Sequence, residues 1–382
     1  MDNHYILAIN PGSTSMKMAI FENDKKVHEY KESFSSDQLA GYMKVIDQVE
    51  LREESIKRFI NSIGETPPLS AVVGRGGVVG PLKSGAYEVN DLLVNRLSYK
   101  PMGEHASNLG GVLATRIAWP LGIKAYVYDC VSVSEQRPLS YLTGFKGVLR
   151  YCRCHILNMR AQAIKAAQEM EKRYDELNII VAHLGGGITL TLHERGRITD
   201  MVLDSEGALS PERAGRLPLN LLINYCKQLD IHYDQLTRMT RGGGGIVSLL
   251  GTNNAQEVEK RVLQGDKMAL LVYKSMAYQV AKSIGELSTV VKGNVDLIIL
   301  TGAMSFSNML TDWIEERVSF ISKVRIIPGE DELEALSRGV LRVLRGEETA
   351  HIYDEETDNW SERNLLQRII NECAQEEGMI TI

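Results

Sequence analysis

Residues 5–21 read YILAINPGSTSMKMAIF and predict two strands joined by a tight, polar turn. The first strand is apolar up to Ile9, and alternating character resumes at Lys17. The turn carries small polar side chains and is followed by a cation: Asn10, Ser13, Thr14, Ser15 and Lys17. Gly12 lets backbone N–H groups approach an anion closely. These residues fit either a phosphate-binding turn or an ordinary polar hairpin.

Bulk composition limits the classes of protein to consider. The chain has 382 residues, enough for two domains, and a net charge of −6 with no concentrated basic segment, which argues against a nucleic-acid partner. No apolar run reaches membrane-spanning length, and the first residues lack a basic signal-peptide region. The cysteine count is five, an odd number in a long chain, which indicates reduced thiols and a cytoplasmic protein.

Three further features in the first half of the chain offer candidate site residues. Arg75 lies in a glycine-rich turn at 74–81, where it suits a carboxylate or phosphate, or else is solvated on a mobile loop. Asp129 ends an apolar strand at 124–129, where it serves chemistry or caps the next loop. His155 begins a long helix, facing a ligand or filling a structural place. Helical spacing also predicts one helix over 38–64.

The strand–turn–strand pattern returns in the second half. Residues 178–192 contain an apolar strand, the break at His183 with Gly185, Gly186 and Gly187, and a second strand, which indicates an internally duplicated fold. A third strand ends near Gly302, whose turn suits a base or ribose. The acidic run at 330–332 precedes a helix, and capping is favoured over magnesium binding there.

Eight motifs in order then resemble butyrate kinases of the acetate kinase family, within the wider group of acetate kinases, sugar kinases, heat-shock ATPases and actin. They are INPGSTSMKMAIF, VVGRGGVVGP, HASNLGG, VAHLGGGI, SPERAGRLP, LLGTNNAQEVEKRV, MAYQVAKSIG and PGEDELEAL. The resemblance covers roughly residues 5–348. It implies an α/β, duplicated actin-like (ribonuclease H-like) two-domain fold with a nucleotide cleft between the halves. We assign domains to 1–150 and 151–346, followed by an acidic extension at 347–382 that docks on the surface or on a neighbouring subunit.

The resemblance also implies roles for particular residues. Those matching catalytic positions are Arg213, Asp129, His155 and His183. Those matching nucleotide and phosphate positions are Asn10, Ser13, Thr14, Ser15, Lys17, Gly185, Gly186, Gly187 and Gly302. Magnesium is assigned to Asn10, Asp129 and Glu332. The acid chain is expected near Arg75, Val78 and Val79.

The implied activity is reversible, in-line phosphoryl transfer from ATP, with Mg²⁺, to butyrate or a branched C4 acid, giving an acyl phosphate. Alternatives are a preference for propionate, isobutyrate or valerate, a phosphatase or ATPase, or a non-catalytic nucleotide-sensing protein. At least a homodimer is expected from the family. Three positions depart from its pattern: Cys130 replaces a proline, Asn254 replaces an aspartate, and Ala303 replaces a glycine.

Overall fold

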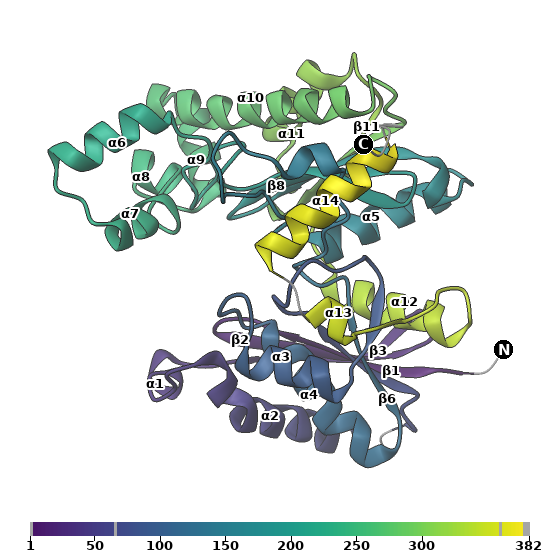
Figure 1. The fold of residues 1–382 in the computed structure, drawn as a ribbon. Coiled ribbons are helices and arrows are strands. Elements are labelled where there is room, and N and C mark those ends of the chain that lie inside the picture. Colours follow the sequence, from purple (N-terminus) through teal and green to yellow (C-terminus); the bar gives the residue numbers. More distant parts are fainter. Residues whose placement is uncertain (1–2, 65–66, 359–360, 377–382) are drawn as a thin grey trace. The chain divides into compact units, whose positions relative to one another are not determined.

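The computed structural model describes residues 3–64, 67–358 and 361–376, and the chain forms two compact units (Figure 1). The first unit combines Met1–Asn158 with Asp331–Ile382, and the second is Met159–Glu330. Residues 331–382 thus cluster with the first unit, whereas the predicted division assigned 331–346 to the second domain and the rest to an extension. The chain leaves the first unit once and returns to it.

A seven-stranded sheet forms the centre of the first unit, in the order β12-β5-β6-β4-β1-β2-β3. The strands are β1 (Tyr5–Pro11), β2 (Ser15–Glu22), β3 (Lys25–Ser33), β4 (Ala71–Arg75), β5 (Ala86–Glu88), β6 (Lys124–Tyr128) and β12 (His351–Ile352). β1 and β2 are the predicted hairpin, paired antiparallel, while β1, β4 and β6 run parallel. The carboxyl ends of β1, β4 and β6 therefore meet at one edge of the sheet.

The first unit also contains helices. They are α1 (Ser36–Leu39), α2 (Val49–Ser62), α3 (Asp91–Tyr99), α4 (Asn108–Ala118), α12 (Glu332–Leu344), α13 (Glu355–Asp358) and α14 (Glu362–Glu376), with short 3-10 helices at η1 (Val45–Gln48), η2 (Trp119–Leu121) and η3 (Pro138–Tyr141). α4 lies directly on β4 because both carry glycine at the contact. A Cβ added to Gly74 would lie 2.0 Å from the carbonyl oxygen of Gly110. α14 buries Leu365 and Ile369 against Tyr141.

The second unit repeats the connectivity of the first around a five-stranded sheet. Its strands are β7 (Asn178–Leu184), β8 (Ile188–Glu194), β9 (Arg197–Val202), β10 (Leu297–Gly302) and β11 (Val324–Pro328), ordered β11-β10-β7-β8-β9. β7–β8–β9 is an antiparallel meander and β7, β10 and β11 are parallel, as in β1–β2–β3 and β1, β4, β6. Both meanders also have a register shift between their second and third strands. The predicted duplication is confirmed.

The helices of this unit pack mainly along α10. They are α6 (Leu219–Gln228), α7 (Tyr233–Thr240), α8 (Ile246–Leu250), α9 (Ala255–Leu263), α10 (Lys267–Val290) and α11 (Asn308–Val318), with η4 (Tyr174–Glu176) and η5 (Ala303–Phe306); α5 (Ile156–Glu169) begins at the end of the first unit. α10 buries Tyr273, Met276 and Val280 in the core, as its small and apolar residues predict. α6 and α7 contain no buried residue.

One local prediction was wrong. The segment 38–64 is not one helix, because α1 ends at Leu39 and the helical backbone resumes only with η1 and α2. The charged residues before it form β3, an edge strand whose exposed side chains hide the strand pattern.

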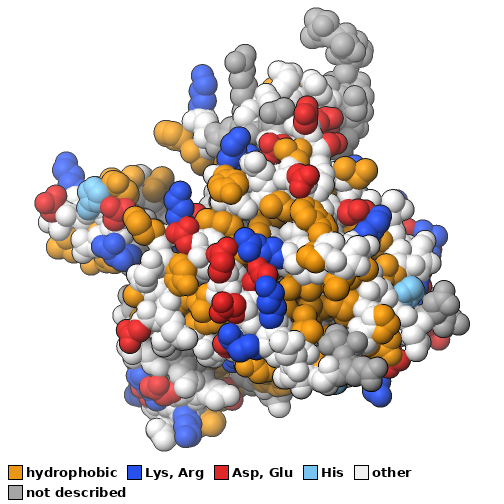
Figure 2. Space-filling model, turned by 90° about the horizontal axis from the view of Figure 1, so that it is seen from below, with side chains coloured by type: hydrophobic (Ala, Val, Ile, Leu, Met, Phe, Trp, Pro, Cys, Tyr) orange, Lys and Arg blue, Asp and Glu red, His pale blue; other side chains and the backbone are white. Residues whose placement is uncertain are grey.

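On the face seen in Figure 2, acidic and basic side chains are interspersed among hydrophobic ones. Within the described residues, no helix is both long and apolar enough to cross a membrane.

Candidate active site

The first turn presents its polar side chains without internal partners. Ser13, Thr14 and Lys17 are exposed and Ser15 is half-buried. Within the described residues, none of these four side chains makes a hydrogen bond or ion pair. The turn is closed by the backbone instead, since Gly12 N donates to Ser15 O at 2.8 Å. The hydroxyls and the ammonium group are available to an anion.

Three of the predicted residues of the first unit meet in one cluster: Asn10, Arg75 and Glu332. Nη1 of Arg75 lies 2.9 Å and 3.0 Å from the two carboxylate oxygens of Glu332. Asn10, buried at the end of β1, donates its Nδ2 to the same carboxylate. The side chains of Arg75 and Glu332 are only 17% and 14% exposed, so Arg75 is a paired residue and not a solvated one.

The acidic residues at 330–332 make different contacts. Asp331 is the N-cap of α12, since its Oδ1 accepts from Glu334 N at 3.2 Å. Glu332, one residue further, turns to Arg75 and Asn10. Capping is therefore performed by Asp331 alone, and Glu332 remains the carboxylate of the cluster.

Asp129 ends the neighbouring parallel strand. In the sheet register, Arg75 pairs with Tyr128, which places Asp129 at the same edge as Arg75 and Asn10. Asp129 is buried, has a φ of 42°, and accepts a hydrogen bond from Gly85 N at 2.7 Å. A non-glycine residue in the left-handed region is strained and is held only by surrounding structure. The carboxylate of Asp129 is held in place by the backbone of Gly85.

The cluster fits a magnesium ion held partly by water and substrate. Asn10 Oδ1 is buried and has no hydrogen-bond partner, which leaves an oxygen ligand unused beside Glu332. Mg²⁺ keeps several waters and takes one or two carboxylates with substrate phosphates, so a dense protein cage is not required. No group of three or more His, Cys, Asp or Glu side chains suited to a metal occurs in the described residues.

The predicted acid-chain residues lie just beyond Arg75. Val79 is fully buried in the core, while Val78 is half-buried and lines a small recess with Met102, Tyr151 and Cys152. The recess measures about 10 Å³, room for a single water-sized group. Of the two valines, Val78 lines this recess and Val79 belongs to the core.

The second turn, in the other unit, holds its histidine with a carboxylate. His183, buried at the end of β7, places Nε2 3.1 Å from Glu330 Oε1. The glycines that follow form the turn, with Gly185 buried, Gly186 exposed and Gly187 half-buried. Gly186 O accepts hydrogen bonds from Ser210 Oγ at 2.7 Å and Glu212 N at 3.1 Å. The turn is therefore fixed to the loop that carries Arg213.

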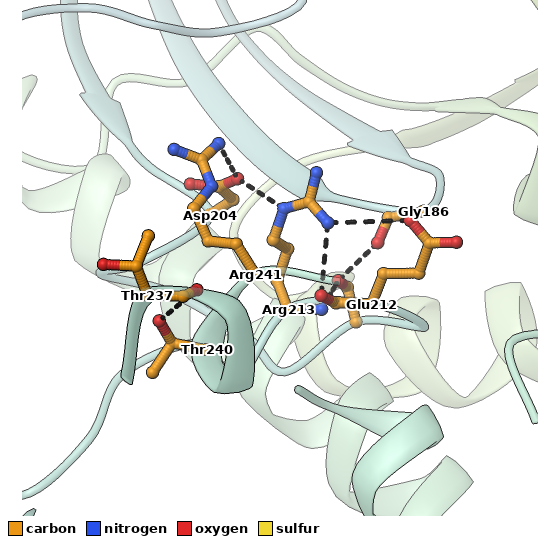
Figure 3. A network of polar contacts seen from close by, with 8 residues as sticks. Gly186, Asp204, Glu212, Arg213, Thr237, Thr240 and Arg241 are labelled. Carbon is orange, nitrogen blue, oxygen red and sulfur yellow. Dashed lines mark hydrogen bonds and ion pairs between the residues drawn. The ribbon is translucent and has the colours of Figure 1, made fainter. Parts of the chain in front are cut away.

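Arg213 is anchored by the network drawn in Figure 3. Its Nε donates to Asp204 Oδ2 at 3.1 Å, and its Nη1 donates to Glu212 O at 3.1 Å. Arg241 donates to the same Asp204 oxygen at 3.0 Å. The Arg213 side chain is 24% exposed, and its Nη2 makes no hydrogen bond within the described residues. The arrangement orients a guanidinium group that still has donors for a ligand.

A cavity of about 600 Å³ opens beside this turn. It is lined by Gly185, Gly186, Asn254, Tyr273, Ala303 and Phe306, among others. Its volume is within the usual range for small-molecule sites, and glycine backbone lies next to aromatic and polar side chains. The cavity can hold a nucleoside whose phosphates extend towards Gly186.

Two residues that depart from the family pattern, Ala303 and Asn254, line the cavity, and Gly302 directly precedes Ala303. Gly302, at the end of β10, has a φ of 90°, and a Cβ there would lie 2.5 Å from Leu184 O, so glycine is required. Ala303 begins η5 and lines the cavity. Asn254 Oδ1 accepts from Gln256 N and Glu257 N at the start of α9. The amide performs the capping of an aspartate without its charge.

Some functional contacts escaped sequence reasoning. Asp204 and Arg241 were not proposed as site residues, and Glu330 was considered only as part of the acidic run at 330–332. Asp204 lies two residues after the end of β9 and Glu330 two residues after the end of β11, near the strand ends where ligand sites form. His155 lies half-buried immediately before α5. Cys130 is fully buried, and a Cβ on Gly76 would lie 2.1 Å from its Sγ. Burial raises the pKa of Cys130 to about 12, so the thiol stays protonated at neutral pH and fills space in the core.

Comparison with known proteins agrees with this geometry. Residues 141–314 match the sequence profile of the Acetokinase family, a segment that contains His155, His183, Arg213 and Gly302. The segment does not include Asn10, Arg75, Asp129 or Glu332.

Solved structures extend the likeness to most of the chain. Acetate kinase of Porphyromonas gingivalis is 18% identical with a TM-score of 0.73, covering 89% of this chain and 100% of that one. A propionate kinase of Francisella tularensis subsp. tularensis is 16% identical with a TM-score of 0.72, covering 88% and 98%. Acetate kinase of Entamoeba histolytica is 16% identical with a TM-score of 0.71, again covering 88% and 98%. The fold is that of acetate and propionate kinases, and the predicted fold class is confirmed.

Proposed function

We infer that this chain is a carboxylate kinase of the acetate kinase family, and propose that it transfers the γ-phosphoryl group of ATP reversibly to a short-chain carboxylate. The observation that carries the proposal is Arg213. It is oriented by Asp204, sits on a loop bonded to the glycine turn, and has unused donors beside a nucleoside-sized cavity. The Acetokinase profile match over the same segment supports it.

The chemistry requires few groups. A carboxylic acid that titrates near ~4 to 5, as Asp and Glu side chains do, is already ionised at neutral pH, so no general base is needed. The obstacles are the repulsion between two anions and their alignment, and phosphoryl transfer is therefore mainly positioning and charge neutralisation. In this proposal Arg213, His183 and His155 contact the oxygens of the transferring phosphoryl group. Lys17 and the hydroxyls of the first turn are assigned to the same group as anion-binding donors.

Magnesium, when bound, neutralises the phosphate oxygens that face each other during transfer. We assign it to three residues: Asn10 lies at the end of β1, Asp129 follows the parallel strand β6, and Glu332 accepts a hydrogen bond from Asn10. Arg75, paired with Glu332, presents a cation for the carboxylate of the acid. In this proposal Mg²⁺ faces the phosphate oxygens and Arg75 faces the carboxylate of the acid. The Oδ1 atom of Asn10, which has no hydrogen-bond partner among the described residues, becomes a ligand of Mg²⁺.

We further propose a C4 acid, butyrate or a branched isomer, as the acceptor. The recess lined by Val78 and Met102 has room for only one water-sized group, so it takes no more than the end of the chain, and the choice of a C4 acid rests on the motif resemblance. A hydrophobic pocket distinguishes acids by only about 1–3 kcal/mol per methylene. Propionate, isobutyrate and valerate are therefore expected to react more slowly, and not to be excluded.

The test is acyl hydroxamate formation with ATP, Mg²⁺ and a panel of C2 to C5 acids. The proposal expects hydroxamate from the wild-type protein with a maximum at C4. Arg213→Ala should lower turnover by about a thousandfold, the contribution of arginines in other phosphoryl transfers. A maximum at another chain length would correct the acid. Release of inorganic phosphate without hydroxamate would indicate an ATPase, and ATP binding without either product a nucleotide sensor.

A further inference from the structure

A buried arginine lies beneath the first turn. Arg52, on α2, has no exposed surface. Its Nη2 donates to Ser13 O at 3.1 Å and its Nη1 to Ser15 O at 3.2 Å. Its remaining donors reach Gln48 Oε1, at 2.8 Å and 3.0 Å. The guanidinium therefore binds two carbonyl groups of the turn from its inner side.

Arg52 is also a buried charge without a counter-ion. Within the described residues, no carboxylate lies in ion-pair distance of its guanidinium, whose other close neighbour is the ring face of Phe34 at 5.0 Å. Burial lowers the pKa of Arg52. Buried arginines are normally paired with an acidic group because removing an unpaired charge from water is costly. An anion bound at the turn would supply the missing counter-charge.

The outer side of the same turn is where an anion fits. Ser13, Thr14, Ser15 and Lys17 have unpartnered polar groups there. A carbonyl held inwards by Arg52 cannot rotate outwards, where its oxygen would repel a phosphate. Fixing the two carbonyls inwards thus keeps the hydroxyls and Lys17 on the ligand side.

We propose that Arg52 is a positioning residue for phosphoryl transfer: it fixes the Ser13–Ser15 turn through two carbonyls, and its buried charge is balanced by the phosphoryl group bound on the opposite side. The inference rests on the proposed function, because it takes the turn to bind the transferring group. It adds a residue that contacts no substrate and supplies both geometry and charge.

The test compares Arg52→Met and Arg52→Lys with the matched control Arg58→Met. Arg58 lies on the same helix, and its side chain is 51% exposed and pairs with Glu32 at 2.6 Å. Arg52→Met removes both the guanidinium donors and the positive charge. Arg52→Lys keeps the positive charge but loses the planar set of donors. We expect about 10- to 100-fold lower kcat with Arg52→Met, less than the roughly 100- to 1,000-fold loss of a donor that contacts the transition state, because Arg52 acts through the turn, and a smaller loss with Arg52→Lys. KM for the carboxylate should stay unchanged, since Arg75 and Val78 are untouched.

Kinetic constants are expressed per folded protein, measured by circular dichroism at the assay temperature. Arg52→Met with kcat within about twofold of Arg58→Met would overturn the proposal, because exposed pairs contribute little. Hydrogen exchange of the amides of residues 12–16 in the ligand-free protein is an independent readout. Faster exchange in both Arg52 variants than in Arg58→Met supports the positioning role, and equal exchange overturns it, even if no acid proves to be a substrate.

Discussion

Replacing Asp204 with Asn should lower the rate of phosphoryl transfer without removing any group that contacts substrate. One oxygen of Asp204 accepts from Arg213 at 3.1 Å and from Arg241 at 3.0 Å. Asparagine keeps the shape and one acceptor but loses the charge. Arg213 then keeps only a weaker contact at its Nε and is held less firmly beside the glycine turn.

The magnitude follows from the two hydrogen bonds. Bonds to charged groups contribute about 1.5–3 kcal/mol and neutral ones about 0.5–1.5, so each bond loses about 1 kcal/mol. Arg241 is 57% exposed, and its contribution is reduced by solvent. The remaining loss of about 1.4 kcal/mol, if it appears fully in the transition state, corresponds to about a tenfold lower kcat.

The assay is steady-state hydroxamate formation at saturating acid and ATP, with Glu286→Gln as control. Glu286 pairs with Arg216 at 2.8 Å, and both side chains are at least half exposed, so its replacement should change kcat by less than about twofold. Asp204→Asn must lie between this control and Arg213→Ala. If Asp204→Asn matched the control while Arg213→Ala lost its activity, the anchoring of Arg213 by Asp204 would be irrelevant to catalysis.

Three other outcomes are expected. Asp129→Asn keeps the acceptor for Gly85 N and should raise the Mg²⁺ concentration for half-maximal activity; an unchanged metal titration rejects the assignment. Gly302→Ala should melt well below Gly265→Ala, which shares a φ near 90° but meets no atom within 4 Å; equal melting temperatures contradict the clash with Leu184. Burial lowers the pKa of His193 to about 3 from about 6.5, so the neutral folded form loses stability as pH falls between these values, by about 1.4 kcal/mol per unit. His193→Gln should flatten urea stability between pH 7 and 5, and an unchanged pH dependence would show that His193 is not its source.

The strand-and-turn frame was predictable from the sequence because each element is locally encoded. Apolar runs of strand length followed by glycine breaks identify β1, β4, β7 and β10, and the repeated pattern identifies the duplication. β3 was missed since an edge strand with charged side chains lacks that signal. The break between α1 and η1 was missed since apolar spacing continues across it.

The site was predictable as positions but not as partnerships. Glycine breaks mark where Gly186 and Gly302 must lie, but no local pattern pairs Arg75 with Glu332, 257 residues away in the chain. Arg52 escaped for a related reason. In the sequence of α2, Arg52 lies among charged residues, a pattern typical of a solvent-exposed helix face. It is buried because other parts of the chain pack over it in the fold.

The most direct measurement of the central claim follows the phosphorus atom itself. The ³¹P NMR spectrum of the protein incubated with ATP, Mg²⁺ and butyrate should develop an acyl phosphate resonance together with ADP, and the resonance should be absent with Arg213→Ala. A spectrum in which ATP persists, or in which only inorganic phosphate accumulates beside ADP, would contradict transfer to the carboxylate.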